Sequence, residues 1–259
     1  MAATERYAAP ASRSTYMGAD DLYNILRSEI LTLKLLPGQL VSENSISHRF
    51  GVSRTPVRSC FERLHQDGFL EVIPKKGTYV TLIDLDLAEQ IIYMRVQVET
   101  SAMTYLAEHP DRMLFERLHR NLEQQKVQLE LGVVDNDFYK LDSQFHEQCL
   151  VAIDKADLWN MIQNMEVQYS RYRHLDYIST RKFQDLYTEH CNLLRFMEDG
   201  CVEKIRPTVT LHLYGGFLRF GTQFVLAHQD YFKDSRRDIN EILLCIKKQL
   251  HESGVRRNP

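Results

Sequence analysis

The chain contains 259 residues, of which 44% are hydrophobic and 26% are charged, a composition typical of a globular protein with one or two domains. No apolar run approaches the ~18 residues of a membrane-spanning helix, so neither a transmembrane segment nor a membrane partner is expected. The five cysteines are odd in number and form no CxxC pair, which favours a reducing cytoplasm and no disulfide.

Charge is unevenly distributed along the chain. Residues 1–83 hold ten Lys and Arg against eight Asp and Glu, which gives this part a net charge of +2. Because the whole chain has a net charge of −3, residues 84–259 carry −5. A weakly basic first part on an acidic second part suits a protein that binds DNA through its first part alone. Residues 1–18 are small and polar without an apolar segment, and they are expected to form a flexible arm rather than a signal peptide.

A first helix is predicted after residue 18. Asp20 and Asp21 open a segment whose apolar side chains recur with a helical period and which stops before Pro37 and Gly38. Its inward positions are Leu22, Ile25, Leu26, Ile30 and Leu33.

Residues 42–68 have the pattern of two further helices joined by a tight turn. Gly51 interrupts the apolar pattern, and Ser53 is placed to cap the second of these helices. Pro56 falls in the first turn, where its missing N–H had no intrahelical partner, and Gly68 ends the helix. Its inward positions are Val57, Phe61 and Leu64.

Two β-rich runs follow, residues 69–73 and 78–82, joined by a basic turn at residues 74–77. A helix-turn-helix followed by such a hairpin is a winged helix. Between Glu43 and Glu62 the chain carries cations and no acid, so the second helix offers donors to phosphates and guanine edges. These cations are Arg49, Arg54 and Arg58, and the turn of the hairpin adds Lys75 and Lys76.

Residues 43–80 resemble the DNA-binding domain of the GntR family of bacterial transcription regulators. The most specific run of that family, Val-Ser-Arg-Thr-Pro-Val-Arg, stands at residues 52–58, and the match extends to residues 36–40 and 76–80. Some members place an Arg where this chain has Asn44, which suggests a different operator contact. The positions that the resemblance implies as DNA contacts are Arg54, Thr55, Arg58, Lys76 and Gly77.

Everything beyond residue 83 has helical patterning, interrupted at Pro110, Gly132 and Gly200, and no alternating strand. Six or seven amphipathic helices favour an antiparallel α-bundle, in which Pro207 or the Gly215–Gly216 pair is expected to bend the sixth helix. The fold class is therefore mainly α, with a winged domain of three helices and a hairpin at residues 19–83, the bundle at 84–252 and a tail at 253–259. The helices are expected at residues 86–108, 111–131, 135–153, 157–178, 181–198, 202–227 and 236–251.

Four side chains of the second part suggest chemistry. Asp142 and His146 are one helical turn apart on one face, and His190 and His212 lie on two later helices beside apolar neighbours. A histidine on an apolar helix face is usually a core residue with a satisfied hydrogen bond, and spacing alone leaves that alternative open. Three imidazoles and one carboxylate would suit zinc, with nickel or manganese as alternatives.

The second part resembles the FCD domain, the all-helical effector domain of FadR-type GntR regulators. Its motifs stand at residues 142–146 (Asp-x-x-Phe-His), 189–190 (Glu-His) and 212–213 (His-Leu), and the opening pair is Arg95 and Glu99. Two positions depart from the usual pattern, Lys155 and Cys201, and neither is a ligand. The resemblance implies that the metal ligands are Asp142, His146, His190 and His212.

The resemblance also implies a small organic acid as effector. Candidates to hold its carboxylate are Arg95, Arg171 and Arg173, because a guanidinium binds a carboxylate with two hydrogen bonds. The alternative for Arg171 and Arg173 is a solvated position on the surface.

Two functions follow. The first is a cytoplasmic transcription regulator that binds a palindromic operator in double-stranded DNA as a homodimer and responds to a small carboxylate at a divalent metal site. The second is a metal-dependent hydrolase with an accessory winged module. Such an enzyme needs a general base beside the metal, and Glu189 is poorly oriented for it, since adjacent helical residues point about 100° apart. The regulator is favoured and no enzyme activity is expected.

Overall fold

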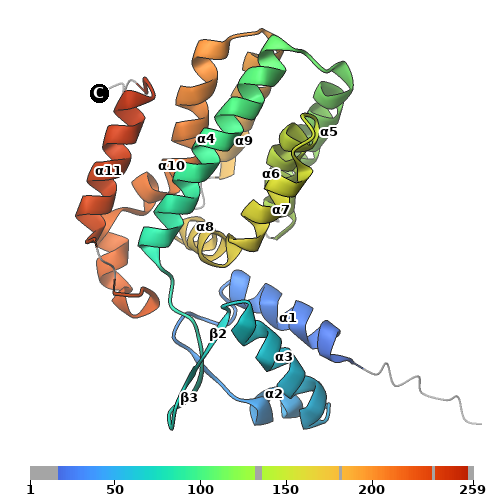
Figure 1. The fold of residues 1–259 in the computed structure, drawn as a ribbon, viewed down its shortest axis with the longest axis vertical. Helices are drawn as coiled ribbons and strands as arrows, with labels where there is room; N and C mark the ends of the chain where they lie inside the picture. The colour runs from blue at the N-terminus through green and yellow to red at the C-terminus, as the bar shows by residue number, and fades with distance from the viewer. Residues whose placement is uncertain (1–16, 132–135, 181–182, 235–236, 256–259) are drawn as a thin grey trace, which may run out of the picture.

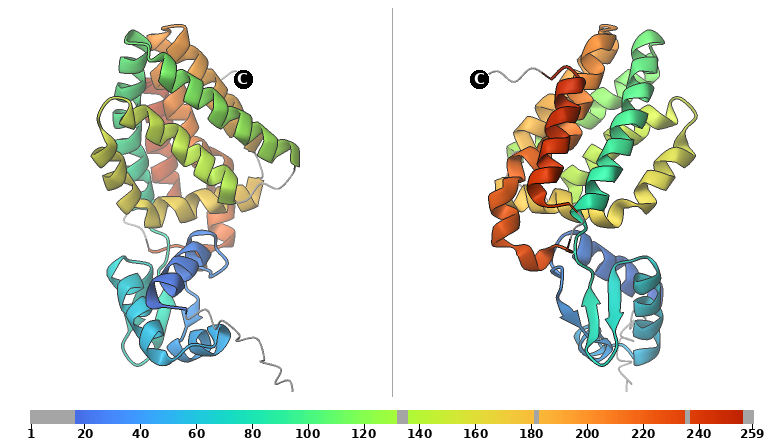
Figure 2. Two further views of the ribbon diagram at one scale, coloured as in Figure 1. Left: turned by 90° about the vertical axis from the view of Figure 1, so that its right-hand side faces the viewer. Right: turned by 60° about the vertical axis from the view of Figure 1, so that its left-hand side comes forward.

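The computed structural model describes residues 17–131, 136–180, 183–234 and 237–255, so most of the predicted N-terminal arm lies outside the described residues. Figure 1 shows two parts, with a small winged part below a larger helical bundle. Both views of Figure 2 show the winged part against one end of the bundle. None of the described helices combines the length and hydropathy of a bilayer-spanning segment.

The winged part contains the three predicted helices and the predicted hairpin. It also contains a two-residue strand that the sequence did not indicate; this strand pairs with the second strand of the hairpin, giving an antiparallel sheet of order β1-β3-β2. Two residues are too few for a periodic signal. The elements are α1 (Ala19–Leu31), β1 (Leu40–Val41), α2 (Glu43–Phe50), α3 (Arg54–Gln66), β2 (Leu70–Ile73) and β3 (Gly77–Val80).

The boundaries of the two central helices follow local chemistry. Gly51 ends α2 with a φ of 65°, a left-handed conformation that glycine adopts readily. Ser53 occupies the N-cap position of α3, but its side chain makes no hydrogen bond there, so the predicted cap is wrong in this respect. A serine cap binds the N–H of the second or third helical residue, and the third residue of α3 is Pro56, which has none. The inward positions Val57, Phe61 and Leu64 are buried, as predicted.

Within the described residues the bundle contains eight α-helices, one more than the seven predicted segments, because the segment at 157–178 is divided at Met165. Its two halves face different apolar clusters: Trp159 packs with Ala102 and Leu150, whereas Tyr169 belongs to the main core. The helices are α4 (Leu85–Glu108), α5 (Arg112–Leu131), α6 (Asn136–Val151), α7 (Ala156–Asn164), α8 (Glu166–Thr180), α9 (Phe183–Glu198), α10 (Val202–Ala227) and α11 (Ile239–Glu252).

Helix α10 is interrupted at a different residue from the one predicted. Its non-helical residue is Gly221, with φ 65° and ψ 173°, whereas Pro207, Gly215 and Gly216 continue the helix. Gly216 instead permits a close contact, since a Cβ there would lie 2.5 Å from the Tyr172 hydroxyl. The expected bend was therefore placed several residues too early, because Gly216 serves packing against α8 rather than flexibility.

Candidate metal centre and DNA-binding surface

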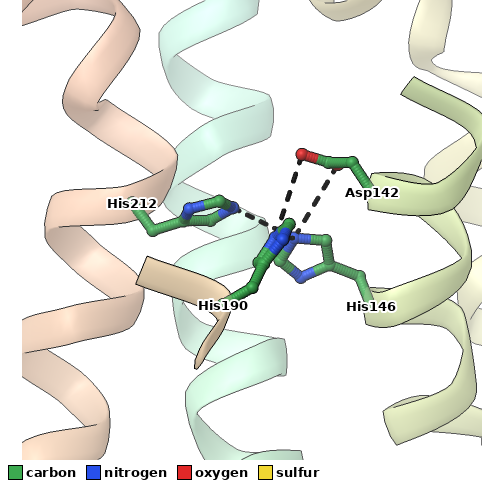
Figure 3. Close-up of side chains that lie close together, drawn as sticks. All are labelled: Asp142, His146, His190 and His212. Carbon is green, nitrogen blue, oxygen red and sulfur yellow. Dashed lines mark hydrogen bonds and ion pairs between the residues drawn. The ribbon is translucent and has the colours of Figure 1, made fainter. Parts of the chain in front are cut away.

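The four predicted metal ligands come together in the middle of the bundle. Helix α6 carries Asp142 and His146, α9 carries His190, and α10 carries His212. One ligand atom from each lies within 4.8 Å of all the others, and Figure 3 shows the three rings and the carboxylate directed at one point. All four side chains are buried, with between 0% and 5% of each residue exposed.

The spacing of the nitrogen atoms fits a metal ion. His146 Nε2 lies 3.1 Å from His212 Nε2 and 3.3 Å from His190 Nε2. The nearest carboxylate oxygens of Asp142 lie 3.9 Å from His146 Nε2 and 3.8 Å from His190 Nε2. Ligand nitrogens about 2.0–2.1 Å from a tetrahedral ion stand roughly 3.3 Å apart. The arrangement therefore matches that of a zinc-sized ion without large movement of the ligands.

Each imidazole is oriented through its other nitrogen. His146 Nδ1 lies 2.6 Å from Glu99 Oε2, and His212 Nδ1 lies 2.9 Å from Glu189 Oε2. His190 Nδ1 lies 2.9 Å from the side-chain oxygen of Gln125. An Nδ1–H that donates to an oxygen leaves Nε2 as the free electron pair, so all three rings present Nε2 to the common point.

Gln125 is a site residue that the sequence did not reveal. Its amide nitrogen donates to Asn121 Oδ1 at 2.7 Å, and Asn121 in turn donates to the Leu141 carbonyl at 2.9 Å. These bonds fix the amide so that its oxygen faces His190. The sequence contains one indication of this role, because two amide side chains one turn apart, Asn121 and Gln125, interrupt the apolar face of α5. This pattern does not indicate which histidine either amide contacts.

Asp142 is held in its charged form by its surroundings. Burial alone would raise the pKa of this carboxyl, but Arg173 and the three imidazoles outweigh burial and keep the pKa below its ordinary value. Arg173 Nη2 lies 2.7 Å from Asp142 Oδ2. For His190, burial and the neighbouring His212 lower the pKa, so this imidazole is neutral at pH 7, the form that binds a metal.

A small cavity adjoins two of the four candidate ligands, Asp142 and His212. Its volume is about 20 Å³, enough for a water molecule, and its lining includes Asp142, His212, Tyr169, Arg173 and Arg219. Arg173, a predicted effector residue, therefore faces the cavity. Arg219 also faces it and was not predicted, because its helix position gives no motif.

The other two predicted effector residues lie outside the lining of this cavity. Arg95 is separated from it by Tyr169, whose ring centre is 4.8 Å from the Arg95 guanidinium carbon. Arg95 Nε donates to Glu99 Oε1 at 2.6 Å and thereby orients the carboxylate that contacts His146. Arg171 is buried as well, but its guanidinium turns toward the segment between the winged part and the bundle. Neither residue is placed to bind an acid in the cavity.

A larger cleft of about 410 Å³ lies between α1 of the winged part and helices α6, α7 and α8. It shares Tyr139 and Arg173 with the small cavity, so those two side chains form the wall between the two spaces. His174 also lines the cleft, and burial lowers its pKa to about 4. The His174 Nδ1–H donates to the Ser170 carbonyl at 2.8 Å, as a neutral imidazole can.

His174 predicts a pH-dependent stability. With a pKa of about 4 in the folded protein and about 6.5 in the unfolded chain, the unfolded state takes up this proton first as the pH falls. Above pH ~6.5, His174 does not lower the free energy of unfolding, because it is neutral in both states. As the pH falls toward ~4, protonation of the unfolded state lowers the free energy of unfolding by about 3 kcal/mol. Urea unfolding from about pH 7 to about pH 4.5 should show a shallower decline for His174→Gln than for wild type. The exposed His119→Gln should behave like wild type, and equal slopes for His174→Gln and wild type would contradict the prediction.

The predicted DNA contacts lie on α3 and on the turn between β2 and β3. Arg54 is the first residue of α3, and the Arg58 side chain is 73% exposed beside Glu62 one turn later. Gly77 has a φ of 133°, and a Cβ there would lie 2.7 Å from Leu40 Cδ1, so this position requires glycine. Exposed cations at a helix N-terminus and at a hairpin turn form a surface suited to DNA phosphates and bases.

Arg49 differs from the other predicted DNA contacts. Its guanidinium forms two hydrogen bonds with the carboxylate of Glu29 on α1 and lies over the Phe50 ring. Because this pairing occupies the fork of donors, Arg49 connects α1 and α2 within the winged part. The cation count of the sequence included it, but its partner is distant in the chain and carries no local signal.

Comparison with known proteins identifies both parts. The model of the bacterial regulatory proteins of the gntR family matches residues 19–80, and the FCD domain model matches residues 90–215. The chain belongs to the GntR family and carries an FCD domain. The first match includes every predicted DNA contact and the second includes all four candidate metal ligands. FCD domains often bind metal, which agrees with the buried Asp and His cluster.

Relatives that match most of the chain are named as HTH-type transcriptional regulators. The transcriptional repressor RspR of Escherichia coli K12 is 28% identical over 192 residues, covering 74% of this chain and 84% of RspR. A regulator from an unstable DNA locus of Streptomyces ambofaciens is 29% identical over 198 residues, covering 76% and 82% of the two chains. The fold resembles that of McbR/YncC from E. coli, with a TM-score of 0.63 and 19% identity over 80% of this chain and 98% of McbR/YncC. This GntR-family protein is a DNA-binding transcription regulator.

Proposed function

We propose that this regulator binds a palindromic operator as a homodimer in the bacterial cytoplasm and responds to a small organic acid at a metal site in the FCD domain. The single observation that carries the proposal is the convergence of four buried side chains from three helices on one point, with every imidazole oriented by an oxygen. Such an arrangement costs stability as a polar core cluster and gains it when a cation is bound.

Asp142, His146, His190 and His212 would hold the ion, and three nitrogens with one oxygen favour zinc, ahead of nickel or manganese. When bound, the ion supplies a positive centre that attracts a carboxylate. Arg173 would provide the second positive group, since it already binds one carboxylate, that of Asp142, at 2.7 Å. The volume of about 20 Å³ means that side chains of the cavity wall must move to admit an acid.

The position of Glu189 argues against the hydrolase alternative, which needs a general base beside the metal. Glu189 is the acid next to a ligand in the chain, and its carboxylate contacts the outer nitrogen of His212 at 2.9 Å. It therefore faces away from the point where the ligands converge and cannot activate water there.

The homodimer follows from the size of the reading surface. A single winged helix contacts too few base pairs to select an operator, and two copies related by a two-fold axis read two half-sites. On DNA, α3 would enter the major groove and the hairpin turn would contact the adjacent backbone, with Arg54, Thr55, Arg58, Lys76 and Gly77 as the contacts.

Operator fragments selected by the purified protein from random DNA test the proposal. Light scattering should give two chains per fragment, and fluorescence anisotropy should show at least a tenfold change in affinity with one member of a carboxylate panel that includes gluconate and citrate. Gluconate is a natural first probe because a relative from Bacillus subtilis is the gluconate operon transcriptional repressor. The change should disappear in metal-stripped protein. One chain per fragment, or an acid response that persists without metal, would contradict the proposal.

A further inference from the structure

The segment between the winged part and the bundle, residues 81–84, is here called the linker. It leaves β3 after Val80 and enters α4 at Leu85, and its peptide groups are bonded on two sides. On one side, Ile83 N donates to the Tyr231 carbonyl and Lys233 N donates to the Ile83 carbonyl, both at 2.9 Å. This pairing resembles a short parallel ladder and leaves the Ile83 side chain fully buried.

Helix α8 binds the other side of the linker. Arg171 donates to the carbonyls of Thr81 and Leu82, at 2.5 Å and 3.4 Å. Gln168, one turn earlier, accepts from the Asp84 amide at 2.9 Å and from Arg171 Nη2 at 3.0 Å. The linker is therefore held by side chains of the bundle along most of its length. A segment bonded in this way has one conformation rather than the many of a free tether.

Arg171 is an unusual residue to find in this place. The residue has no exposed surface, and its guanidinium contacts backbone carbonyls and the Gln168 amide; none of its partners among the described residues is a carboxylate. Burial lowers its pKa to about 10. A buried cation without a counter-ion is costly, and what Arg171 provides in return is a set of donors to the linker carbonyls that an apolar side chain of similar size lacks. Carbonyl oxygens at two successive peptide groups are acceptors that the planar fork of arginine can reach together.

The same helix contacts the candidate metal centre. Arg173, two residues after Arg171, binds the candidate ligand Asp142 at 2.7 Å. Between them, Tyr172 stacks on Phe217 of α10 with ring centres 4.3 Å apart. At the start of α8, Val167 packs against the apolar core of the winged part. One helix thus touches the metal centre, the linker and the winged part.

We propose that Arg171 is a positioning residue for DNA recognition: it fixes the linker so that the winged part is presented to DNA at one orientation relative to the bundle. The inference rests on the proposed dimer, because orientation matters for binding when two winged parts must meet two half-sites at a fixed separation. It gives α8 the role of the element through which a change at Arg173 would reach the DNA-binding surface. Arg171 thereby has a function distinct from the acid binding that the sequence suggested.

Three variants separate positioning from simple stability. Arg171→Met removes the donors and keeps the apolar volume, and Arg171→Lys keeps a charge with a single donor group. Leu114→Ala is the control, since it opens a cavity at a fully buried position near the start of α5, a helix that packs against α6 and α9. All three should retain one metal ion per chain, because none of these side chains contacts a candidate ligand.

Hydrogen exchange measured by mass spectrometry reports the linker directly. In Arg171→Met, peptides spanning residues 81–84 should exchange at least tenfold faster than in wild type, with no comparable change in α3. Arg171→Lys should be intermediate. Leu114→Ala should leave linker exchange within about twofold of wild type relative to the rest of the bundle. Unchanged linker exchange in Arg171→Met would overturn the inference.

Operator affinity measures how the orientation of the winged part affects DNA binding. Arg171→Met should bind the selected two-half-site fragment at least tenfold more weakly, while its affinity for a single half-site stays within about twofold of wild type. It should also lose the preference of wild type for the selected spacing over spacings altered by one or two base pairs. Equal losses on both fragments, or in Leu114→Ala, would overturn positioning. If wild type itself shows no preference for two half-sites, the proposed dimer is wrong, and linker exchange still decides whether Arg171 holds the linker.

Discussion

His190→Ala/His212→Ala protein is expected to retain less than about a tenth of the metal that wild type holds after loading with zinc and dialysis. Two of four ligands are removed, and the remaining pair, Asp142 and His146, comes from a single helix and cannot enclose an ion. In wild type, zinc at about a hundred times its dissociation constant should add roughly 2.7 kcal/mol to the free energy of unfolding. The double variant should show no such gain.

Elemental analysis and thermal unfolding with and without zinc, nickel and manganese measure both effects. The matched control is His109→Ala/His119→Ala, which removes two exposed histidines from the same part of the chain. This control should hold as much metal as wild type and gain as much stability. Wild type that holds none of the three metals would leave the buried histidines as core residues.

Metal binding is expected to weaken as the pH falls. Imidazoles bind metal in the neutral form, so acidification releases the ion once protons compete. Because burial lowers the pKa of His146 and His190 from the ordinary value near 6.5, this competition begins at a lower pH than for exposed histidines. Zinc content should therefore persist through pH ~6.5 and fall at lower pH.

Arg54→Ala/Arg58→Ala protein is expected to lose most of its affinity for a selected operator. Each arginine that reads a base contributes about 1–3 kcal/mol, so the pair together should weaken binding at least about thirtyfold. Both lie near the start of α3, and neither has a partner beyond Glu62 among the ion pairs of the described residues. Lys76→Ala should weaken binding to all sequences alike, because a phosphate contact carries no sequence information.

The control for this experiment lies on the same helix. Arg63 faces α1, where it pairs with Asp20 at 3.0 Å and covers the Tyr23 ring at 3.8 Å. Arg63→Ala has the same change in net charge as either single variant, yet its operator affinity at fixed salt should change by less than about threefold. Wild-type affinity in the Arg54→Ala/Arg58→Ala protein would show that α3 is not the helix that reads DNA.

Local patterns predicted the winged part well because its signals are short in range. Pro56, Gly51 and Gly68 set helix boundaries through their own backbone preferences, and those preferences do not depend on distant residues. The break at Gly221 was missed because Pro207 and the Gly215–Gly216 pair are the stronger local signals, whereas Gly216 continues the helix in close contact with Tyr172. The division of the helix at Met165 was missed for a related reason, since only the positions of the two apolar clusters require it.

The sequence indicated which side chains form the candidate metal centre, but it did not indicate the residues that surround and orient them. Asp142 and His146 reveal their common face through spacing alone. The partners of the outer nitrogens could not be assigned, because Gln125 and His190 are 65 residues apart and meet only through packing of α5 against α9. The same limit explains Arg95 and Arg171, whose type suggested anion binding while their partners, Glu99 and two linker carbonyls, decide what they do.

The way Leu33 is buried affects how this chain could be recombined with its relatives. It follows α1 with a φ of 58°, and its side chain is buried in the core of the bundle rather than in that of the winged part. A hybrid protein joined at residue 83 would therefore place a different residue 33 in the core of this bundle and a different linker sequence beside the buried Arg171. Exchange of DNA specificity between such regulators should succeed when only residues of α3 and the hairpin turn are transplanted. It should fail when residues 19–83 are exchanged as a whole, because Leu33 is then replaced while the bundle core that surrounds it is not.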